Sequence, residues 1–151
     1  LDSNNEELDT ASVNELRRQD TRLQLKWLDS VLSSSSAKWK IVAAHHPVYS
    51  GGEHGNTPEM IEEIEPILTK YKVNLYLCGH DHDMQHIKMP GSNINYFVAG
   101  SGSKLRKTAK TDNSLFASSE NGFLNIRIEK DFIEATFIDV TGKEIYSYRI
   151  K

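Results

Sequence analysis

Apolar residues recur at helical spacing in two stretches of the first half of the chain. One stretch predicts an amphipathic helix over 23–32, after a polar surface segment over 3–22. The other predicts a helix over 57–71, which we expect to be kinked or interrupted at Pro66 because proline lacks the N–H of a helical bond. The apolar faces consist of Leu25, Leu28, Val31 and Leu32 in the first helix and Ile61, Ile64, Ile67, Leu68 and Tyr71 in the second.

Short apolar runs bounded by polar residues predict three buried strands. These runs cover residues 40–44, 73–78 and 95–99. The polar residues 103–121 that follow, basic at first, are typical of a mobile loop.

The last thirty residues alternate between apolar and polar side chains with a period of two. This alternation over 123–128, 132–138 and 145–150 predicts a three-stranded antiparallel meander within 122–151. Strand–helix units followed by a meander indicate an α/β fold of layered type. In such folds ligands bind at the carboxyl ends of the strands, which here carry histidines.

Composition narrows the possible functions. The chain has 151 residues, the size of one domain, and a formal net charge of -3, which argues against a nucleic-acid partner. No apolar run approaches the roughly 20 residues of a membrane-spanning helix, so we expect no membrane partner. A single cysteine, Cys78, excludes an internal disulfide. All six histidines lie between positions 45 and 86, which points to a site, since imidazole is a common metal ligand.

Gly79-His80-Asp81-His82 is the clearest chemical signal in the chain. In an extended backbone after a strand, His80 and His82 project to the same side and Asp81 faces away. Gly79 would allow a sharp turn beside a ligand. Two imidazoles on one face can serve one metal or two adjacent metals.

His45-His46 follows the first predicted strand, and His54 lies in the next glycine-containing loop. If the first two strands are neighbours, His45 reaches the volume of His80, and alternation leaves only one of His45 and His46 as a ligand. His54 could hold a substrate phosphate or protonate a leaving group. His86 is interpreted as a packing or surface residue.

In combination, three segments resemble the purple acid phosphatases, closest to the small tartrate-resistant type within the calcineurin-like metallophosphoesterases. The segments are Ala44-His45-His46-Pro47-Val48-Tyr49-Ser50, Glu53-His54-Gly55 and Tyr76-Leu77-Cys78-Gly79-His80-Asp81-His82. The resemblance implies two stacked mixed sheets flanked by helices, a four-layer β-sandwich of which this chain would build half. Compartments typical of the family are secreted, periplasmic or lysosomal.

The resemblance also assigns roles to individual residues. His45 and His80 resemble ligands of the divalent metal, and His82 resembles a ligand of iron(III). His54, with Glu53 beside it, resembles the residue that contacts substrate phosphate and protonates the leaving group; His46 inherits no ligand role. Members of the family pair Fe(III) with Fe(II), Zn(II) or Mn(II) and hydrolyse phosphomonoesters by attack of a metal-bound hydroxide.

The family's remaining ligands are two aspartates, a tyrosine and an asparagine from glycine-containing motifs in its N-terminal half. In this chain the first glycine is Gly51 and the first tyrosine is Tyr49, so we expect 1–151 to be the C-terminal half of a larger phosphoesterase. The missing N-terminal half is its expected partner, together with a phosphate-ester substrate. We expect the isolated chain to have little or no activity.

The sequence is compatible with three alternative functions. One is a metallophosphodiesterase or nucleotide phosphoesterase. Another is a non-catalytic scaffold with the same fold. The third is a module that binds a single metal through three histidines.

Overall fold

The computed structural model describes residues 21–151, which divide into a unit ending at Ser34 and a larger unit, Ser35–Lys151. In the first unit the described part is α2 (Thr21–Ser34), which confirms the helix predicted over 23–32; Leu28 and Leu32 are its buried side chains. The polar segment predicted over 3–22 lies outside the described residues, except for Thr21 and Arg22, which are helical. Within residues 21–151 no helix has the length and apolarity needed to cross a bilayer.

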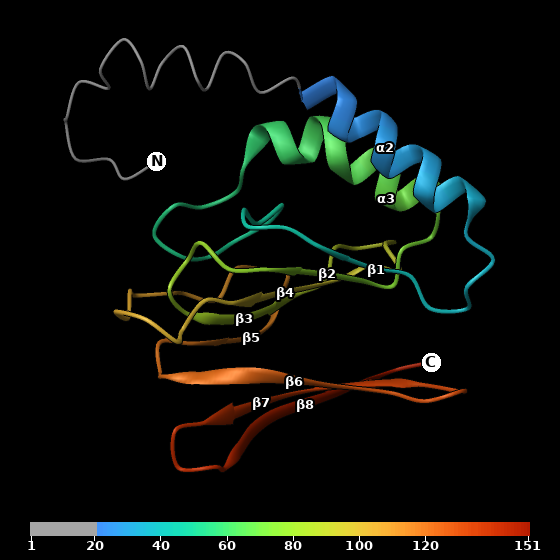
Figure 1. Cartoon of the computed structure of the whole chain (residues 1–151). Helices are drawn as coiled ribbons and strands as arrows, with labels where there is room; N and C mark the ends of the chain where they lie inside the picture. The colour runs from blue at the N-terminus through green and yellow to red at the C-terminus, as the bar shows by residue number, and fades with distance from the viewer. Residues whose placement is uncertain (1–20) are drawn as a thin grey trace, which may run out of the picture. The chain divides into compact units, whose positions relative to one another are not determined.

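A five-stranded mixed sheet forms the centre of the larger unit. Its strands are β1 (Ile41–Ala43), β2 (Leu75–Cys78), β3 (Met84–Ile87), β4 (Asn95–Ala99) and β5 (Ser114–Ser118). They lie in the order β1-β2-β4-β3-β5 (Figure 1). β1, β2 and β4 run parallel, whereas β3 is antiparallel to both β4 and β5. β2 and β4 are largely buried as predicted, but the prediction of a buried strand over 40–44 is wrong, because β1 lies at the edge of the sheet and exposes Ile41 and Ala43.

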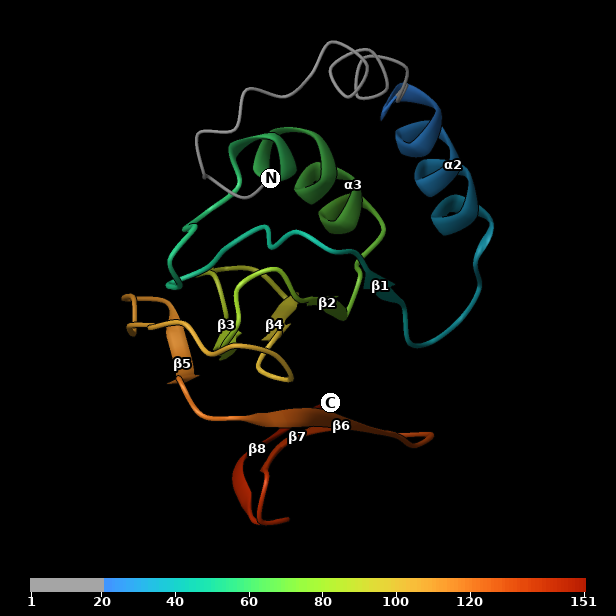
Figure 2. The same cartoon turned by 60° about the vertical axis from the view of Figure 1, so that its left-hand side comes forward.

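The predicted meander is confirmed as a second, three-stranded antiparallel sheet. It consists of β6 (Gly122–Ile128), β7 (Ile133–Asp139) and β8 (Glu144–Ile150). Figure 2 shows the chain passing from β5 of the first sheet directly into β6 of the second.

The two sheets enclose the main core. Leu75, Met84 and Phe97 from the first sheet contact Ile133, Ala135, Phe137 and Ile150 from the second. Burial of such side chains contributes about 1.5–3 kcal/mol each. Aromatic rings link the layers, with Phe116 of β5 stacked on Phe137 at 5.4 Å and on Tyr146 at 4.6 Å between ring centroids. The other face of the first sheet carries α3 (Glu65–Lys70), so this unit has three layers (Figure 1).

The helix predicted over 57–71 is interrupted, as expected, next to Pro66. A π-helical turn, η1 (Met60–Ile64), precedes α3, and Pro66 occupies the first turn of α3. Proline has no backbone N–H and cannot donate a helical hydrogen bond. The change from π-helical to α-helical turns therefore falls beside the residue that lacks this donor.

Two strands of the sheet were not predicted. β3 lies in a segment with two polar residues, Gln85 and His86, and both side chains are fully buried. β5 lies within 103–121, so the prediction of a loop over that whole segment is wrong for Ser114–Ser118. β3 pairs with β4 and with β5, and β5 pairs with β3, so both strands depend on long-range pairing that local periodicity does not show.

Candidate metal centre

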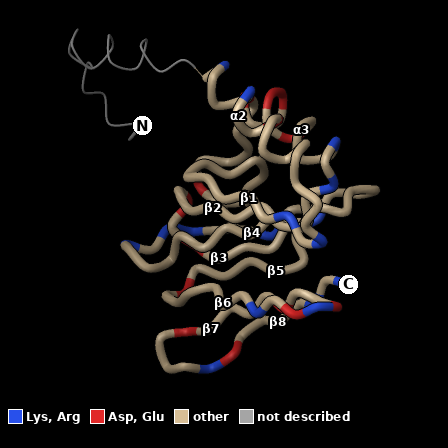
Figure 3. The backbone as a smooth tube through the Cα atoms, turned by 45° about the vertical axis from the view of Figure 1, so that its right-hand side comes forward, with Lys and Arg blue, Asp and Glu red and all other residues tan. Residues whose placement is uncertain are grey.

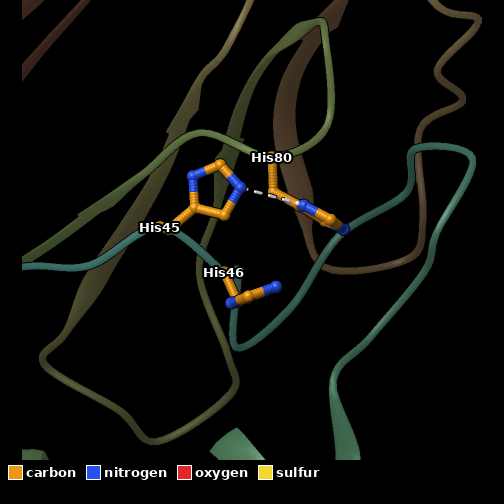
Figure 4. A group of neighbouring side chains, drawn as sticks. All are labelled: His45, His46 and His80. Carbon is orange, nitrogen blue, oxygen red and sulfur yellow. Dashed lines mark hydrogen bonds between the residues drawn. The ribbon is translucent and has the colours of Figure 1, made fainter. Parts of the chain in front are cut away.

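The ends of β1 and β2 bring His45 and His80 together. The strands are parallel neighbours with Ile41 opposite Leu75. We expected from the sequence that His45 would reach His80 if these two strands were neighbours. The pairing continues beyond the strands, because Gly79 donates its N–H to the carbonyl oxygen of His45 at 3.1 Å. His45 Nε2 lies 3.2 Å from His80 Nδ1 (Figure 4).

His46 joins these two rings. Within the described part of the chain, His45, His46 and His80 form a group whose ligand atoms all lie within 4.8 Å of one another (Figure 4). The ring centroid of His46 lies 4.5 Å from that of His80. Strict alternation of His45 and His46 does not apply, because the backbone bends at both residues. Three imidazoles form a donor set that zinc and related cations accept.

Two imidazoles of this group, those of His46 and His80, have a lowered pKa. Burial, followed by the repulsion of protonated His54, His46 and His45, lowers the pKa of His80 to about 4. Burial, followed by the charge of His45, lowers the pKa of His46. Neutral imidazole is the form that binds metals, so no proton has to be removed from these two rings near neutral pH.

The backbone at the Gly79-His80-Asp81-His82 motif turns more tightly than an extended chain. Asp81 donates its N–H to the carbonyl oxygen of Gly79 at 2.8 Å, and His80 between them has φ +64°. This three-residue turn places the strained left-handed backbone on His80, whereas we expected the turn at Gly79. The assumption of an extended chain through His80 and His82 is therefore wrong.

His82 lies outside the three-histidine group. Its Nδ1 lies 2.7 Å from the carbonyl oxygen of Lys104. A carbonyl only accepts, so Nδ1 carries the proton and Nε2 keeps its lone pair. A backbone carbonyl that fixes the tautomer in this way is typical of metal-binding histidines. The ligand role of His82 stays a prediction.

Asp81 is the functional residue that sequence reasoning missed. Its side chain is fully buried and lies 2.6 Å from His54 Nδ1, in contrast to the expectation that it faces away from the site. It also accepts the backbone N–H of His54 at 3.2 Å and the hydroxyl of Ser50. Burial acts to raise the pKa of Asp81, but the hydrogen bonds from Ser50 and His54 outweigh it and lower the pKa. The signal in the sequence was an aspartate between His80 and His82. A carboxylate that is buried there needs hydrogen-bond donors nearby.

His54 lies between Asp81 and a second residue that the sequence did not single out, Arg106. Arg106 Nη1 lies 2.8 Å from His54 Nε2, and its Nε lies 3.4 Å from a carboxylate oxygen of Glu53. Arg106 also donates its backbone N–H to the carbonyl oxygen of His82 at 3.1 Å. The segment after β4 is thus bonded to both histidine loops, where we had expected a mobile loop. The ring of His54 lies 4.2 Å from that of His80, next to the group of three.

Two glycines allow the backbone to close around Asp81. A Cβ on Gly52 would lie 2.6 Å from the carboxyl carbon of Asp81, and one on Gly100 would lie 2.0 Å from its backbone oxygen. Gly100-Ser101-Gly102 forms a turn after β4.

Comparisons with known proteins identify similar proteins among the metallophosphoesterases. Residues 2–84 match the family model described as calcineurin-like phosphoesterase. Purple acid phosphatase 3 of Arabidopsis thaliana is 37% identical over 130 residues, which cover 83% of this chain and 36% of that protein. Tartrate-resistant acid phosphatase type 5 of Homo sapiens is 31% identical over 139 residues, which cover 85% of this chain and 42% of that protein.

Two solved structures resemble the fold. One is described as GAP50, the anchor in the inner membrane complex of Plasmodium; its TM-score is 0.80 at 28% identity, covering 86% of this chain and 42% of that chain. The other is purple acid phosphatase PPD1 from yellow lupin seeds, with a TM-score of 0.77 at 19% identity, covering 85% of this chain and 28% of that chain. The latter likeness concerns the fold alone.

The chain spans about two fifths of the length of the curated relatives it matches. The family model covers more than half of the chain, and the α/β architecture agrees with that family's fold. The resemblance inferred from the histidine motifs is confirmed, and the chain belongs to the calcineurin-like phosphoesterase family.

Proposed function

We propose that this chain carries the histidine part of the active site of a metal-dependent phosphomonoesterase of the acid phosphatase type. The observation that carries the proposal is the group His45, His46 and His80 beside a histidine, His54, that a buried carboxylate orients. A cluster of imidazole ligands next to an oriented proton donor suits the hydrolysis of a charged ester.

In this proposal His45 and His80 hold the divalent metal and His82 holds the second metal, iron(III) in the family pattern. Three imidazoles bring no negative charge to offset two cations. We therefore propose that carboxylate ligands come from a further part of the protein, in line with the share of its relatives that the chain spans. The edge strand β1 exposes Ile41 and Ala43, and no described strand pairs with its outer side, which leaves room for such a part.

Three residues near the histidine group, His54, Asp81 and Arg106, have separate roles in the proposed reaction. Asp81 accepts the Nδ1–H of His54, so His54 Nε2 faces the site, and the imidazolium form of His54 can give its Nε2 proton to the ester oxygen as the P–O bond breaks. The alcohol leaves with that proton, and phosphorus receives oxygen from water. Arg106 can donate to phosphate oxygens once substrate replaces its contact with His54. Metal ions bound here would polarise the ester and neutralise the charge that develops on phosphate.

The test measures turnover of p-nitrophenyl phosphate by the protein that contains this chain, loaded with iron and zinc, and by the 151-residue chain alone. We expect turnover in the first case and little or none in the second. His54→Asn should lower kcat by about 10²–10⁴-fold, the usual contribution of a general acid, without loss of bound metal. Absence of turnover in the metal-loaded protein would refute the proposal, and normal turnover by the isolated chain would refute the need for another part.

Two alternatives give different results in the same assay. Faster turnover of bis-p-nitrophenyl phosphate than of the monoester would favour a phosphodiesterase. A non-catalytic scaffold is favoured by the likeness to a structure described as an anchor. That alternative predicts no turnover of either ester even when elemental analysis finds two metals per protein.

A further inference from the structure

A cationic cavity lies at the end of the sheet opposite to the histidines. It is bordered by residues at the amino ends of β1, β2 and β4, among them Lys40, Asn74 and Asn93, and has a volume of about 520 Å³. Its cationic lining residues are Lys38, Lys40, Lys72, Lys88, Arg149 and Lys151. In Figure 3 several blue segments gather between α3 and the C-terminal end of the chain.

The charges of this cavity are not balanced locally, since its described lining contains no aspartate or glutamate. Lys38 and Arg149 pair with carboxylates outside the lining, Asp131 at 3.3 Å and Glu134 at 2.6 Å. Lys40, Lys72 and Lys88 have no carboxylate partner among residues 21–151, whereas Lys151 brings the α-carboxylate of the last residue together with its ammonium group. Three uncompensated ammonium groups around one cavity repel one another unless an anion lies between them.

Lys88 and Lys40 donate only to neutral oxygens. Lys88 Nζ lies 3.4 Å from Asn95 Oδ1, and Lys40 Nζ lies 3.2 Å from the carbonyl oxygen of Tyr71. Partial burial lowers the pKa of Lys88, so its charge is retained at a cost. Asn74 uses its side-chain oxygen to accept the backbone N–H of Lys40, which leaves its amide N–H groups as further donors at the cavity.

Lys72 occupies a backbone position that normally favours glycine. It follows α3 with φ +53°, and its N–H bonds to the carbonyl oxygen of Thr69 while that of Val73 bonds to Leu68. This pattern is a Schellman C-cap, whose left-handed residue is most often glycine because a Cβ is strained there. A lysine at this position brings a charge to the cavity at the expense of backbone strain.

We propose that this cavity binds a small anion that carries two or more phosphate groups. The proposal rests on the number of charges: one phosphate monoester carries about -1.5 to -2, whereas three lysines of the lining, Lys40, Lys72 and Lys88, lack a countercharge. Lysine ammonium groups bind phosphate oxygens as point charges, and the volume is that of a small-molecule site. The site is separate from the histidines and does not depend on the proposed phosphatase activity.

The phosphates could belong to an inorganic chain or to an organic molecule. A second cavity of about 370 Å³ shares Lys72 and Asn93 with the first and is lined in part by Val73, Met89 and Ile94. It offers apolar surface to an organic group. Tripolyphosphate and ATP are therefore the two probes. Tighter binding of ATP would identify an organic phosphate and equal binding a phosphate chain alone, and either result supports the proposal.

The test is isothermal titration calorimetry on the 151-residue chain in EDTA, which keeps metals away from the histidines. We expect saturable one-to-one binding of tripolyphosphate that weakens as salt rises, and much weaker binding of inorganic phosphate. Lys88→Gln and Lys72→Gly should each weaken binding about tenfold, the usual loss for a hydrogen bond to a charged group. Lys110→Gln, which removes an exposed lysine outside the cavity, should have no effect.

Lys72→Gly also separates lost binding from lost folding. Because glycine relieves the strain at φ +53°, the melting temperature of this variant should equal or exceed that of the parent chain. His45→Ala should bind tripolyphosphate as the parent does. The proposal is overturned by absence of saturable binding, by an equal loss in Lys110→Gln, or by a loss in His45→Ala.

Discussion

Asp81 holds a buried negative charge whose partners are the Ser50 hydroxyl and both the backbone and the ring of His54. Each bond fixes one feature of the site: the proton on His54 Nδ1, the path of the loop that carries His54, and the position of Ser50. Since hydrogen bonds to a charged group contribute about 1.5–3 kcal/mol, this single side chain organises the loop between β1 and the second helix.

We predict that Asp81→Asn lowers kcat of the metal-loaded protein about 10–100-fold and destabilises the fold by about 1–3 kcal/mol. The amide is neutral, so it holds the imidazole of His54 less firmly. Steady-state kinetics and urea unfolding measure the two effects. Asp112→Asn, at an exposed loop position, is the matched control and should change neither. Equal behaviour of the two variants would contradict the role given to Asp81.

His86, interpreted from sequence as a packing or surface residue, is a fully buried packing residue. Its Nε2 donates to Asn95 Oδ1 at 3.1 Å, and its Nδ1 accepts the Tyr146 hydroxyl at 2.8 Å. Its ring stacks on Phe97 with centroids 4.1 Å apart. A neutral imidazole with its proton on Nε2 satisfies both hydrogen bonds. Burial lowers its pKa to about 4, although Asn95 acts to raise it.

This histidine makes stability depend on pH. Between its ordinary pKa of about 6.5 and its folded pKa of about 4, the unfolded chain binds a proton that the folded chain does not. Stability is therefore full above the upper value and falls as pH falls, by up to about 3 kcal/mol from His86 alone. Urea unfolding at steps from pH 7 to pH 4 should show a smaller loss for His86→Gln than for the parent. Identical slopes would contradict this prediction.

At the scale of elements, the end of β4 is packed against the turn that carries the metal motif. Gly100 donates its N–H to the carbonyl oxygen of Asp83 at 3.0 Å, and its α-carbon faces the backbone of Asp81. Two residues on, Gly102 has open space around the position of a Cβ and no positive φ. The two glycines of one short motif therefore have different structural demands.

We predict that Gly100→Ala destabilises the larger unit by about 1–3 kcal/mol, because its Cβ would lie 2.0 Å from the Asp81 backbone oxygen. Gly102→Ala should leave stability within about 0.5 kcal/mol, as expected at an unconstrained surface position. Thermal or urea unfolding of the pair measures the difference. A loss of the same size in both variants would show that the close approach to Asp81 is unimportant.

Periodicity predicted the elements whose pattern is local. The first helix and the meander carry a repeat of 3.6 or 2 residues that shows which face is buried, and β1, β2 and β4 are short apolar runs bounded by polar residues. β3 and β5 show neither signal, because β3 has polar Gln85 and His86 among its four buried side chains and β5 is a short strand at the edge of the sheet. Their place in the sheet depends on partners distant in sequence.

At the scale of the whole molecule, the histidines should form one metal site in the chain by itself. We predict that zinc binds at one ion per chain and stabilises folding by about 2.7 kcal/mol at a hundredfold excess over its Kd. His45→Ala and His80→Ala should abolish this binding, because their nitrogens lie 3.2 Å apart at the centre of the group. His82→Ala should retain it, since His82 lies outside the group.

The same titration on His46→Ala decides between two ligand sets. The sequence resemblance gave His46 no ligand role, whereas the geometry places it beside His80. Loss of zinc binding would include His46 in the site of the isolated chain, and retention would restrict that site to His45 and His80. Elemental analysis gives the stoichiometry, and a thermal shift gives the stabilisation.

The sequence by itself determined the fold class, the histidines of the candidate site and their place at the ends of the first two strands. These depend on residue type and on short-range periodicity, which one chain displays directly. Only the tertiary structure decided that Asp81 faces His54, that Arg106 lies beside His54 and His46 beside His80, and that lysines from four separate segments border one cavity. The physical reason is that such contacts join residues up to a hundred positions apart, and turns such as that at His80 break the alternation from which side-chain direction is predicted.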